Sequence, residues 1–243
     1  MKLLLTLMSC TLAYLLPAQE TITKTYPVKA GQQLELSFDY PKVVKVSTWD
    51  KNEVAVIATV NINGGENNNA FQLIDKTDGN ILSVKNIISD MKSLPRRYTI
   101  MADGKKTVFT SKEEFEAYKS TTKSVKYYSD GPDIEISVEV KVPQNMASTF
   151  LKATYGIVEL SNFKAPLKVD ATYGGIDAVI NTSQTGKLNV TTNYGQVYTN
   201  LDLNITDKVE KDFHTSFTAT GKQGPEYSLK STYGNLYLRK PVQ

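Results

Sequence analysis

The sequence predicts an all-β protein: a β-solenoid of short stacked strands, interrupted by a small insertion made of a hairpin and a helix. Two observations support this fold class. Residues 151–198 alternate apolar and polar side chains with a period of two, which is typical of half-buried strands. A Tyr-Gly unit also recurs at similar spacings in the C-terminal half. A recurring unit of this length predicts strands that stack in successive coils.

Residues 1–18 have the features of a secretory signal peptide. Lys2 precedes an apolar run that ends before Pro17, and the small Ala18 is followed by polar Gln19. This run is shorter than the roughly 20 residues that a membrane-spanning helix needs. A lipobox around Cys10 is the minority alternative and would attach a lipid there, but the apolar sequence continues beyond it. We therefore expect an exported protein of the periplasm or cell surface, cleaved after Ala18.

The mature chain, residues 19–243, is expected to form a single β-repeat domain without disulfides, because Cys10 is the only cysteine of the sequence. The 28 basic and 25 acidic side chains are interspersed, so no nucleic-acid partner is expected. No segment after the signal peptide is apolar over a length that would predict a transmembrane helix.

Two degenerate copies of the repeat are expected near the N-terminus. Residues 34–41 resemble the repeat but carry Pro41 at the glycine position, which favours a place at an edge or end of the fold. Residues 73–80 lead through Gly79 into another short apolar strand. Both copies would extend the repeat over most of the mature chain.

Residues 89–132 interrupt the pattern. A hairpin is expected over residues 96–109 around Asp103-Gly104, and Ser111 begins a capping box that predicts a helix to about Lys119. The polar residues 120–132 are expected to form a mobile loop. Such an insertion must project from the repeat, either as a binding element or as a spacer or cap.

The repeat itself is clearest in four Tyr-Gly copies after a strand over residues 134–142. Their tyrosines are separated by 18, 21 and 39 residues, and 39 is close to two further periods. We expect each glycine to supply the positive φ of a tight corner between two strands. The four tyrosines are Tyr155, Tyr173, Tyr194 and Tyr233.

Stacked copies would align these tyrosines as an aromatic ladder, and this makes them the candidate ligand-contact residues. Such a ladder could bind sugars by stacking, or it could stabilise the corners without any ligand. Exposed rings would favour glycan binding, whereas buried rings would exclude it.

No catalytic, cofactor or metal site is expected. His214 lies near Asp212 and Ser216, but no nucleophile-elbow glycines surround this serine. Gly174-Gly175-Ile176-Asp177 is a single copy without the tandem pattern of calcium-binding β-rolls.

A carbohydrate-active enzyme would need a cluster of carboxylates on one face. Stacking could bring Glu159, Asp170 and Asp177 together, although they alternate with apolar residues as ordinary outward positions do.

The strand order resembles the putative adhesin family of bacterial β-strand repeat proteins, a domain of unknown function. The resembling segments are residues 34–46, the strand over residues 134–143, and the Tyr-Gly units from Tyr155 to Tyr233. The resemblance covers most of the mature chain except residues 89–132. It implies an exported β-solenoid or solenoid-like sandwich with a role in surface adhesion or envelope interactions, and no catalytic residues to carry over.

The sequence thus favours a non-enzymatic cell-envelope protein that binds a protein or glycan partner. A structural or accessory envelope protein without a ligand is the alternative, with self-association through the ends of the solenoid. A β-helix polysaccharide-active enzyme is the third hypothesis.

Overall fold

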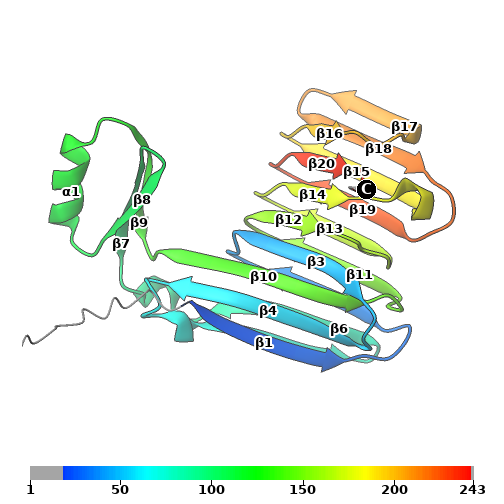
Figure 1. The fold of residues 1–243 in the computed structure, drawn as a ribbon, viewed down its shortest axis with the longest axis horizontal. Coiled ribbons are helices and arrows are strands. Elements are labelled where there is room, and N and C mark those ends of the chain that lie inside the picture. Colours follow the sequence, from blue (N-terminus) through cyan, green and yellow to red (C-terminus); the bar gives the residue numbers. More distant parts are fainter. Residues whose placement is uncertain (1–18, 242–243) are drawn as a thin grey trace, which may run out of the picture.

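The computed structural model describes residues 19–241, and within this range the protein is built almost entirely of strands (Figure 1). The expected signal peptide, residues 1–18, lies outside the described residues, as does the alternative lipid site at Cys10. None of the helices between residues 19 and 241 combines the length and apolar character needed to cross a membrane. The prediction of an all-β fold is confirmed.

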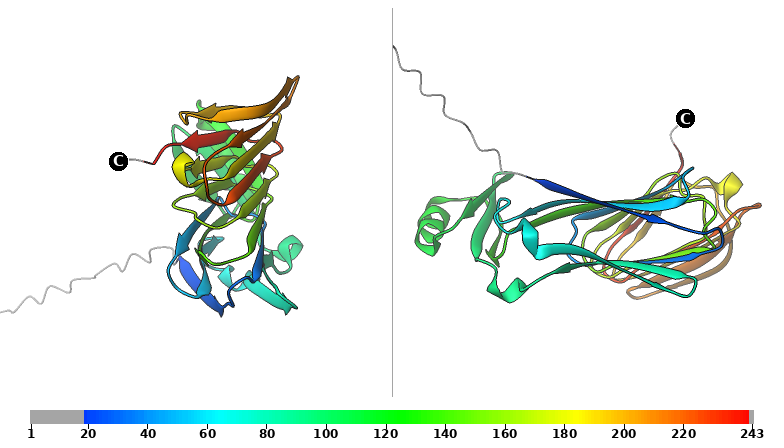
Figure 2. Two further views of the ribbon diagram at one scale, coloured as in Figure 1. Left: turned by 90° about the vertical axis from the view of Figure 1, so that its right-hand side faces the viewer. Right: turned by 90° about the horizontal axis from the view of Figure 1, so that it is seen from below.

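Two large sheets face each other and enclose one core (Figure 2). The first sheet has the strand order β1-β4-β10-β3-β12-β14-β20-β16, and the second has the order β17-β18-β15-β19-β13-β11-β2-β6-β5. The strands of the first sheet are β1 (Glu20–Pro27), β3 (Val43–Trp49), β4 (Glu53–Ile62), β10 (Ile134–Pro143), β12 (Ile157–Leu160), β14 (Ile176–Val179), β16 (Val197–Thr199) and β20 (Leu236–Arg239). The strands of the second sheet are β2 (Gln33–Phe38), β5 (Phe71–Asp78), β6 (Ile81–Ile88), β11 (Ser148–Ala153), β13 (Leu167–Ala171), β15 (Lys187–Asn193), β17 (Asn204–Lys211), β18 (His214–Thr220) and β19 (Glu226–Ser231).

Alternation along the strands builds the core. In β2, Leu34, Leu36 and Phe38 are buried, while the residues between them face solvent. The second strand of the same repeat, β3, lies in the other sheet and buries Val44 and Val46 in the same way. Side chains like these from both sheets join a single apolar cluster, and their removal from water is the main stabilising term of the fold.

The central strands of both sheets run parallel. In the second sheet β6, β2, β11, β13, β19 and β15 pair in parallel, and in the first sheet β10, β3, β12, β14, β20 and β16 do the same. Each Tyr-Gly unit therefore gives one strand to each sheet. The outer strands pair antiparallel, as β1 does with β4 and β17 with β18. Because both sheets are mixed, the prediction of a solenoid is not confirmed as such.

Both degenerate N-terminal copies differ from expectation. The copy with Pro41 does not lie at a sheet edge, because β2 lies between β6 and β11 and β3 between β10 and β12. Pro41 is tolerated there because it sits in the corner between two strands, outside both ladders. The copy around Gly79 is a simple antiparallel hairpin of β5 and β6, so it is not a repeat corner.

The order of the repeats in space differs from their order in the chain. Strands β19 and β20, from the last copy, lie between β13 and β15 in the second sheet and between β14 and β16 in the first. The interval of 39 residues between the last two tyrosines contains the hairpin β17–β18, which extends the second sheet beyond β15. The interpretation of this interval as two further periods is therefore wrong.

The insertion at residues 89–132 projects beyond one end of β10 (Figure 1). It is a three-stranded sheet of order β8-β7-β9 with one helix, and the expected hairpin and helix are both present. The expected mobile loop is wrong in part, because residues 125–131 form β9, which pairs with β7. The elements are β7 (Arg97–Ala102), β8 (Lys105–Phe109), α1 (Lys112–Thr121) and β9 (Val125–Gly131). The 3-10 helices within residues 19–241 are η1 (Asn68–Ala70), η2 (Met91–Ser93) and η3 (Thr182–Gln184).

Candidate functional site

A continuous column of six stacked aromatic rings lies along one edge of the molecule. Five of the rings lie at corners where strands of the second sheet turn into strands of the first, and the sixth lies in the turn between β17 and β18. Neighbouring ring centroids are 5.1–5.5 Å apart along the whole column. Four of the rings are the tyrosines that the sequence singled out, and the structure brings all four together. The order along the column is Tyr40, Tyr155, Tyr173, Tyr233, Tyr194 and Phe213.

The glycine after each tyrosine allows the corners to stack. A Cβ on Gly174 would lie 1.4 Å from the carbonyl oxygen of Gly156, and one on Gly234 would lie 2.3 Å from that of Gly174. Only Gly156 has the positive φ, +77°, that we expected for all four glycines. The expectation is therefore wrong for the other three, including Gly195, where the requirement is close backbone approach rather than a left-handed conformation.

Backbone hydrogen bonds continue through the corners and hold the rings in register. The amide of Tyr173 donates to the carbonyl of Thr154 at 3.0 Å, and the amide of Tyr233 donates to that of Thr172 at 2.9 Å. Because each corner is tied to its neighbour in this way, the rings repeat at nearly the spacing of adjacent strands.

Buried hydroxyl groups complete these corners. Ser231 Oγ donates to the carbonyl of Gly174 at 2.8 Å, and Thr192 Oγ1 donates to that of Gly234 at 2.9 Å. Both side chains are fully buried, so these bonds satisfy groups that solvent does not reach.

The column is open to solvent. The exposed fraction of its tyrosines ranges from 43% at Tyr155 to 61% at Tyr194, and that of Phe213 is 74%. Inside the column each ring is covered on both faces by its neighbours, so the inner tyrosines present their edges to water. A free ring face remains at the Phe213 end, where no further ring follows.

Phe213 is a column member that sequence reasoning missed. It lies in the turn between β17 and β18, outside any Tyr-Gly unit, so no repeat signal marks it. Its φ is +54°, and Tyr194 beside it has a φ of +53°, a conformation that bulky residues rarely adopt. The amide of Tyr194 donates to the carbonyl of Phe213 at 2.7 Å, which ties the two residues together. The surrounding turn and corner must therefore hold both residues in this conformation.

A polar recess of about 510 Å³ lies at this end of the column. Tyr194 and Phe213 line it together with Tyr198, which stacks on Tyr237 at 5.2 Å in a second, shorter aromatic pair. Gln196 lines the recess as well and accepts a hydrogen bond from the hydroxyl of Tyr198. The end of the column thus combines open aromatic surface with hydrogen-bonding groups.

The insertion is anchored beside the opposite end of the column. Lys42, two residues after Tyr40, pairs with Glu135 at 2.6 Å. Lys106 of the insertion pairs with the same carboxylate at 2.8 Å and with Asp133 at 2.5 Å. Hydrogen bonds from Lys106 and Lys42 lower the pKa of Glu135 below its usual value. This shared carboxylate joins the insertion to the first corner of the column.

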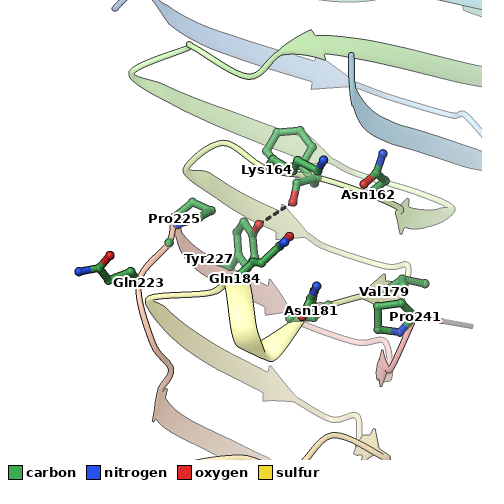
Figure 3. A pocket seen from close by; sticks show the side chains of 12 residues that line it. Asn162, Lys164, Val179, Asn181, Gln184, Gln223, Pro225, Tyr227 and Pro241 are labelled. Atoms are coloured by element: carbon green, nitrogen blue, oxygen red, sulfur yellow. Dashed lines mark hydrogen bonds between the residues drawn. The ribbon is translucent and has the colours of Figure 1, made fainter. Parts of the chain in front are cut away.

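A second hollow, of about 530 Å³, lies among the return connections, the segments that lead into β13, β15 and β19 of the second sheet (Figure 3). Tyr227 forms part of its floor and donates a hydrogen bond to the carbonyl of Phe163 at 2.6 Å. Burial raises the pKa of Tyr227 to about 12, so its ring is neutral at physiological pH. Amide side chains, among them Asn181 and Gln184, lie around this floor.

Both ring nitrogens of His214 contact polar side chains, as the histidine of a catalytic triad does. Its Nδ1 lies 2.7 Å from Asn193 Oδ1, and its Nε2 lies 3.2 Å from Ser216 Oγ. The strand that carries both His214 and Ser216, β18, is paired with β15 on one side and with β17 on the other. Its backbone amides are therefore committed to the sheet, and they are poorly placed to form an oxyanion hole beside the serine.

The three carboxylates considered for an enzyme do not form one cluster. Glu159 and Asp177 are register partners on the first sheet, but Asp170 lies on β13 of the second. Asp177 also pairs with Arg239 at 2.8 Å, which gives it an ordinary structural partner. The expectation that stacking could unite all three is wrong.

Comparison with known proteins leaves the family open. No protein-family model matches the chain, and no curated protein matches it. A solved structure described as a putative cell adhesion protein from Clostridium sporogenes is similar with a TM-score of 0.47 and 10% sequence identity, over 92% of this chain and 100% of that chain. A putative adhesin from Bacteroides fragilis has a TM-score of 0.23 and 11% identity, over 93% of this chain and 99% of that one. At these scores neither likeness establishes a family or a function, and the resemblance to the adhesin-like repeat family remains a resemblance.

Proposed function

We propose that the protein is an exported, non-enzymatic, adhesin-like interaction module of the cell envelope, which binds a glycan or protein partner along the aromatic column. The parallel central part of its two sheets is the solenoid-like scaffold that holds the column straight. The observation that carries the proposal is the exposure of all six rings, because a contiguous apolar patch on a protein surface commonly marks an interaction site.

The position of the column adds support. Its Tyr40 end lies beside the anchored insertion, and its Phe213 end opens into the polar recess. One edge of the molecule therefore presents three features that can contact a partner together. The open face of Phe213 suits the apolar face of a sugar ring, and the exposed tyrosine edges offer hydroxyl groups along the row.

Glycan-array binding by the mature protein tests this proposal. Phe213→Ala removes the open ring face from an exposed turn, so it is expected to reduce binding without unfolding the protein. Ile87→Ala is the control, because Ile87 is an exposed apolar residue on β6 and lies outside both the column and the insertion. Equal binding by the wild type and the Phe213→Ala variant would refute a role for the column end.

The insertion is tested separately by a variant in which residues 89–132 are replaced with a short Gly-Ser linker. If the insertion contributes to the interface, this variant binds glycans or purified envelope proteins more weakly than the full chain. Unchanged binding would assign the insertion a spacer or capping role.

A structural or accessory envelope protein without a ligand is the second candidate, and the stacking itself favours it. Every inner ring packs on two others, and such contacts stabilise corners with no partner present. Self-association through the sheet ends would accompany this role, but the edge strand β17 opposes it. Lys208 and Glu210 on β17 form an ion pair at 2.7 Å, and charged side chains on an edge strand disfavour pairing with another chain. Sedimentation of the mature protein over a range of concentrations distinguishes the two roles.

A further inference from the structure

The hollow among the return connections lies at the other end of the strands from the aromatic column, and its origin is visible in the chain. The Tyr-Gly corners are similar in length and stack without gaps, whereas the connections over residues 161–166, 180–186 and 221–225 differ in length and course. These three connections surround a space of about 530 Å³, within the roughly 300–1,000 Å³ typical of small-molecule sites.

The walls of this hollow are fixed by close backbone contacts. A Cβ on Gly224 would lie 2.0 Å from the carbonyl oxygen of Gln184, and one on Gly186 would lie 2.5 Å from that of Gly224. Two connections far apart in sequence therefore touch backbone to backbone. A site with walls held in this way loses little conformational entropy when it binds a ligand.

The floor is apolar and the rim is rich in hydrogen-bond donors. Phe163, Ile180 and Tyr227 are buried beneath the hollow, and the hydroxyl of Tyr227 is already used by a backbone carbonyl. Asn181 Oδ1 accepts hydrogen bonds from Ser183, which leaves its amide hydrogens free to donate. Figure 3 shows the Gln184 side chain next to Tyr227 over this floor.

The single positive charge of the hollow indicates which chemical class of ligand it can bind. Lys164 is the only charged side chain among the residues that line it, and within residues 19–241 it has no ion-pair partner. A single ammonium group matches the single charge of a carboxylate, whereas it would neutralise only part of the charge of a phosphate group. An amino acid fits poorly, because none of the lining side chains is acidic and could pair with its ammonium group.

We propose that this hollow binds a carboxylate-bearing sugar residue, with the carboxylate at Lys164, the hydroxyl groups at Asn181 and Gln184, and the apolar face of the ring against the floor. The site is separate from the aromatic column, so it can exist whether or not the column binds a partner.

Nuclear magnetic resonance titration of the mature protein with D-glucuronate tests the site. Saturable shifts of the side-chain amide signals of Gln184 and Asn181 are expected, with glucose binding about tenfold more weakly because it lacks the charge-assisted contact. Acetate is expected to leave these signals unchanged. Shifts with acetate equal to those with glucuronate, or no saturable shift with glucuronate, would overturn the proposal.

Two lysine variants separate a specific contact from general surface charge. Lys164→Gln is expected to lower the affinity for glucuronate about tenfold, to the level of glucose. Lys222→Gln removes the same charge from a nearby residue whose side chain does not line the hollow, and its affinity should match the wild type. Equal losses in both variants would show that only the overall charge of this end matters.

Discussion

The corner glycines make the sharpest prediction about stability. Gly174→Ala introduces a Cβ that would lie 1.4 Å from the carbonyl oxygen of Gly156 and 2.4 Å from its carbonyl carbon. Since ordinary contact begins at 3.4 Å, the two corners would have to separate by about 2 Å. Both atoms belong to the backbone, so no side-chain rotation can relieve the clash.

The magnitude follows from what this separation breaks. Hydrogen bonds of 3.0 Å join the corners on either side of the glycines, from Tyr173 to Thr154 and from Val158 to Gly175. Each contributes about 0.5–1.5 kcal/mol, and overpacking adds about 1–3 kcal/mol. We therefore expect Gly174→Ala to lower the free energy of unfolding by about 3 kcal/mol or more.

Urea denaturation followed by circular dichroism measures this loss. Gly131→Ala is the matched control, because its new Cβ would meet no atom within 4 Å and the change should stay within about 0.5 kcal/mol of wild type. A loss below about 1 kcal/mol for Gly174→Ala would show that the corners relax easily, and would refute close backbone approach as the reason for glycine.

Three further changes probe the ring column, the floor of the hollow and the anchor of the insertion. Tyr173→Leu removes two stacking contacts worth about 0.5–1.5 kcal/mol each, so it should lower both the free energy of unfolding and the near-ultraviolet circular dichroism of the column. Tyr227→Phe leaves the carbonyl of Phe163 without its donor and should cost about 1–3 kcal/mol in urea denaturation. Lys106→Met removes the first cause of the lowered pKa of Glu135, so this pKa should rise in a carboxyl-resolved NMR titration.

Each of these changes has a control or a contrary result. Tyr127→Leu, on an exposed ring outside the column, should leave the near-ultraviolet signal of the column unchanged. A Tyr227→Phe variant as stable as wild type would mean that water replaces the lost hydroxyl. Lys105→Met changes the neighbouring charge on the same hairpin, and an equal rise in the pKa of Glu135 there would argue against the direct bond from Lys106.

The same groups set the pH dependence of stability. Glu135 has a lowered pKa, so its contribution is present above the unfolded value of 4.5 and is lost as the pH falls through the folded value. Tyr227 has a raised pKa, so its contribution is present below the unfolded value of 10.0 and is lost as the pH rises through about 12. Acid should therefore weaken the anchor of the insertion, and strong base should weaken the floor of the hollow.

Local patterns in the sequence were sufficient for most strands and for four of the six rings of the column. Alternation places Leu34 and Leu36 in the core, and the Tyr-Gly unit places each tyrosine at a corner, because both depend only on neighbouring residues. Strand β9 was missed because it is an edge strand with mostly exposed side chains, so it has no alternation to detect. Its pairing is specified by β7, which lies elsewhere in the sequence.

The order of the repeats could not be predicted for a different reason. All four units carry the same Tyr-Gly corner, so the unit ending at Tyr233 could stack on any of the others. In the structure the hydroxyl of Ser231 binds the carbonyl of Gly174, and that of Thr192 binds the carbonyl of Gly234. These contacts are compatible with the observed order. However, an alanine or a hydroxyl residue at the position of Ser231 or Thr192 does not specify which repeat stacks against that corner.

This interchangeability has a consequence for where ligands can bind. Corners with the same Tyr-Gly sequence stack on one another. Their ring faces are then covered by neighbouring rings, and their backbone groups are hydrogen-bonded to neighbouring corners. Surface that can bind a ligand remains at two places where the repeat pattern ends. One is Phe213, which ends the column outside any repeat, and the other is the hollow around Gln184, which return connections of unequal length leave open. Partner binding at the column should therefore be weakened less by Tyr155→Leu, an inner-column change, than by Phe213→Ala, and neither change should alter glucuronate binding at Lys164. If Tyr155→Leu abolished glycan binding while the protein remained folded, the inner column itself would be the binding surface.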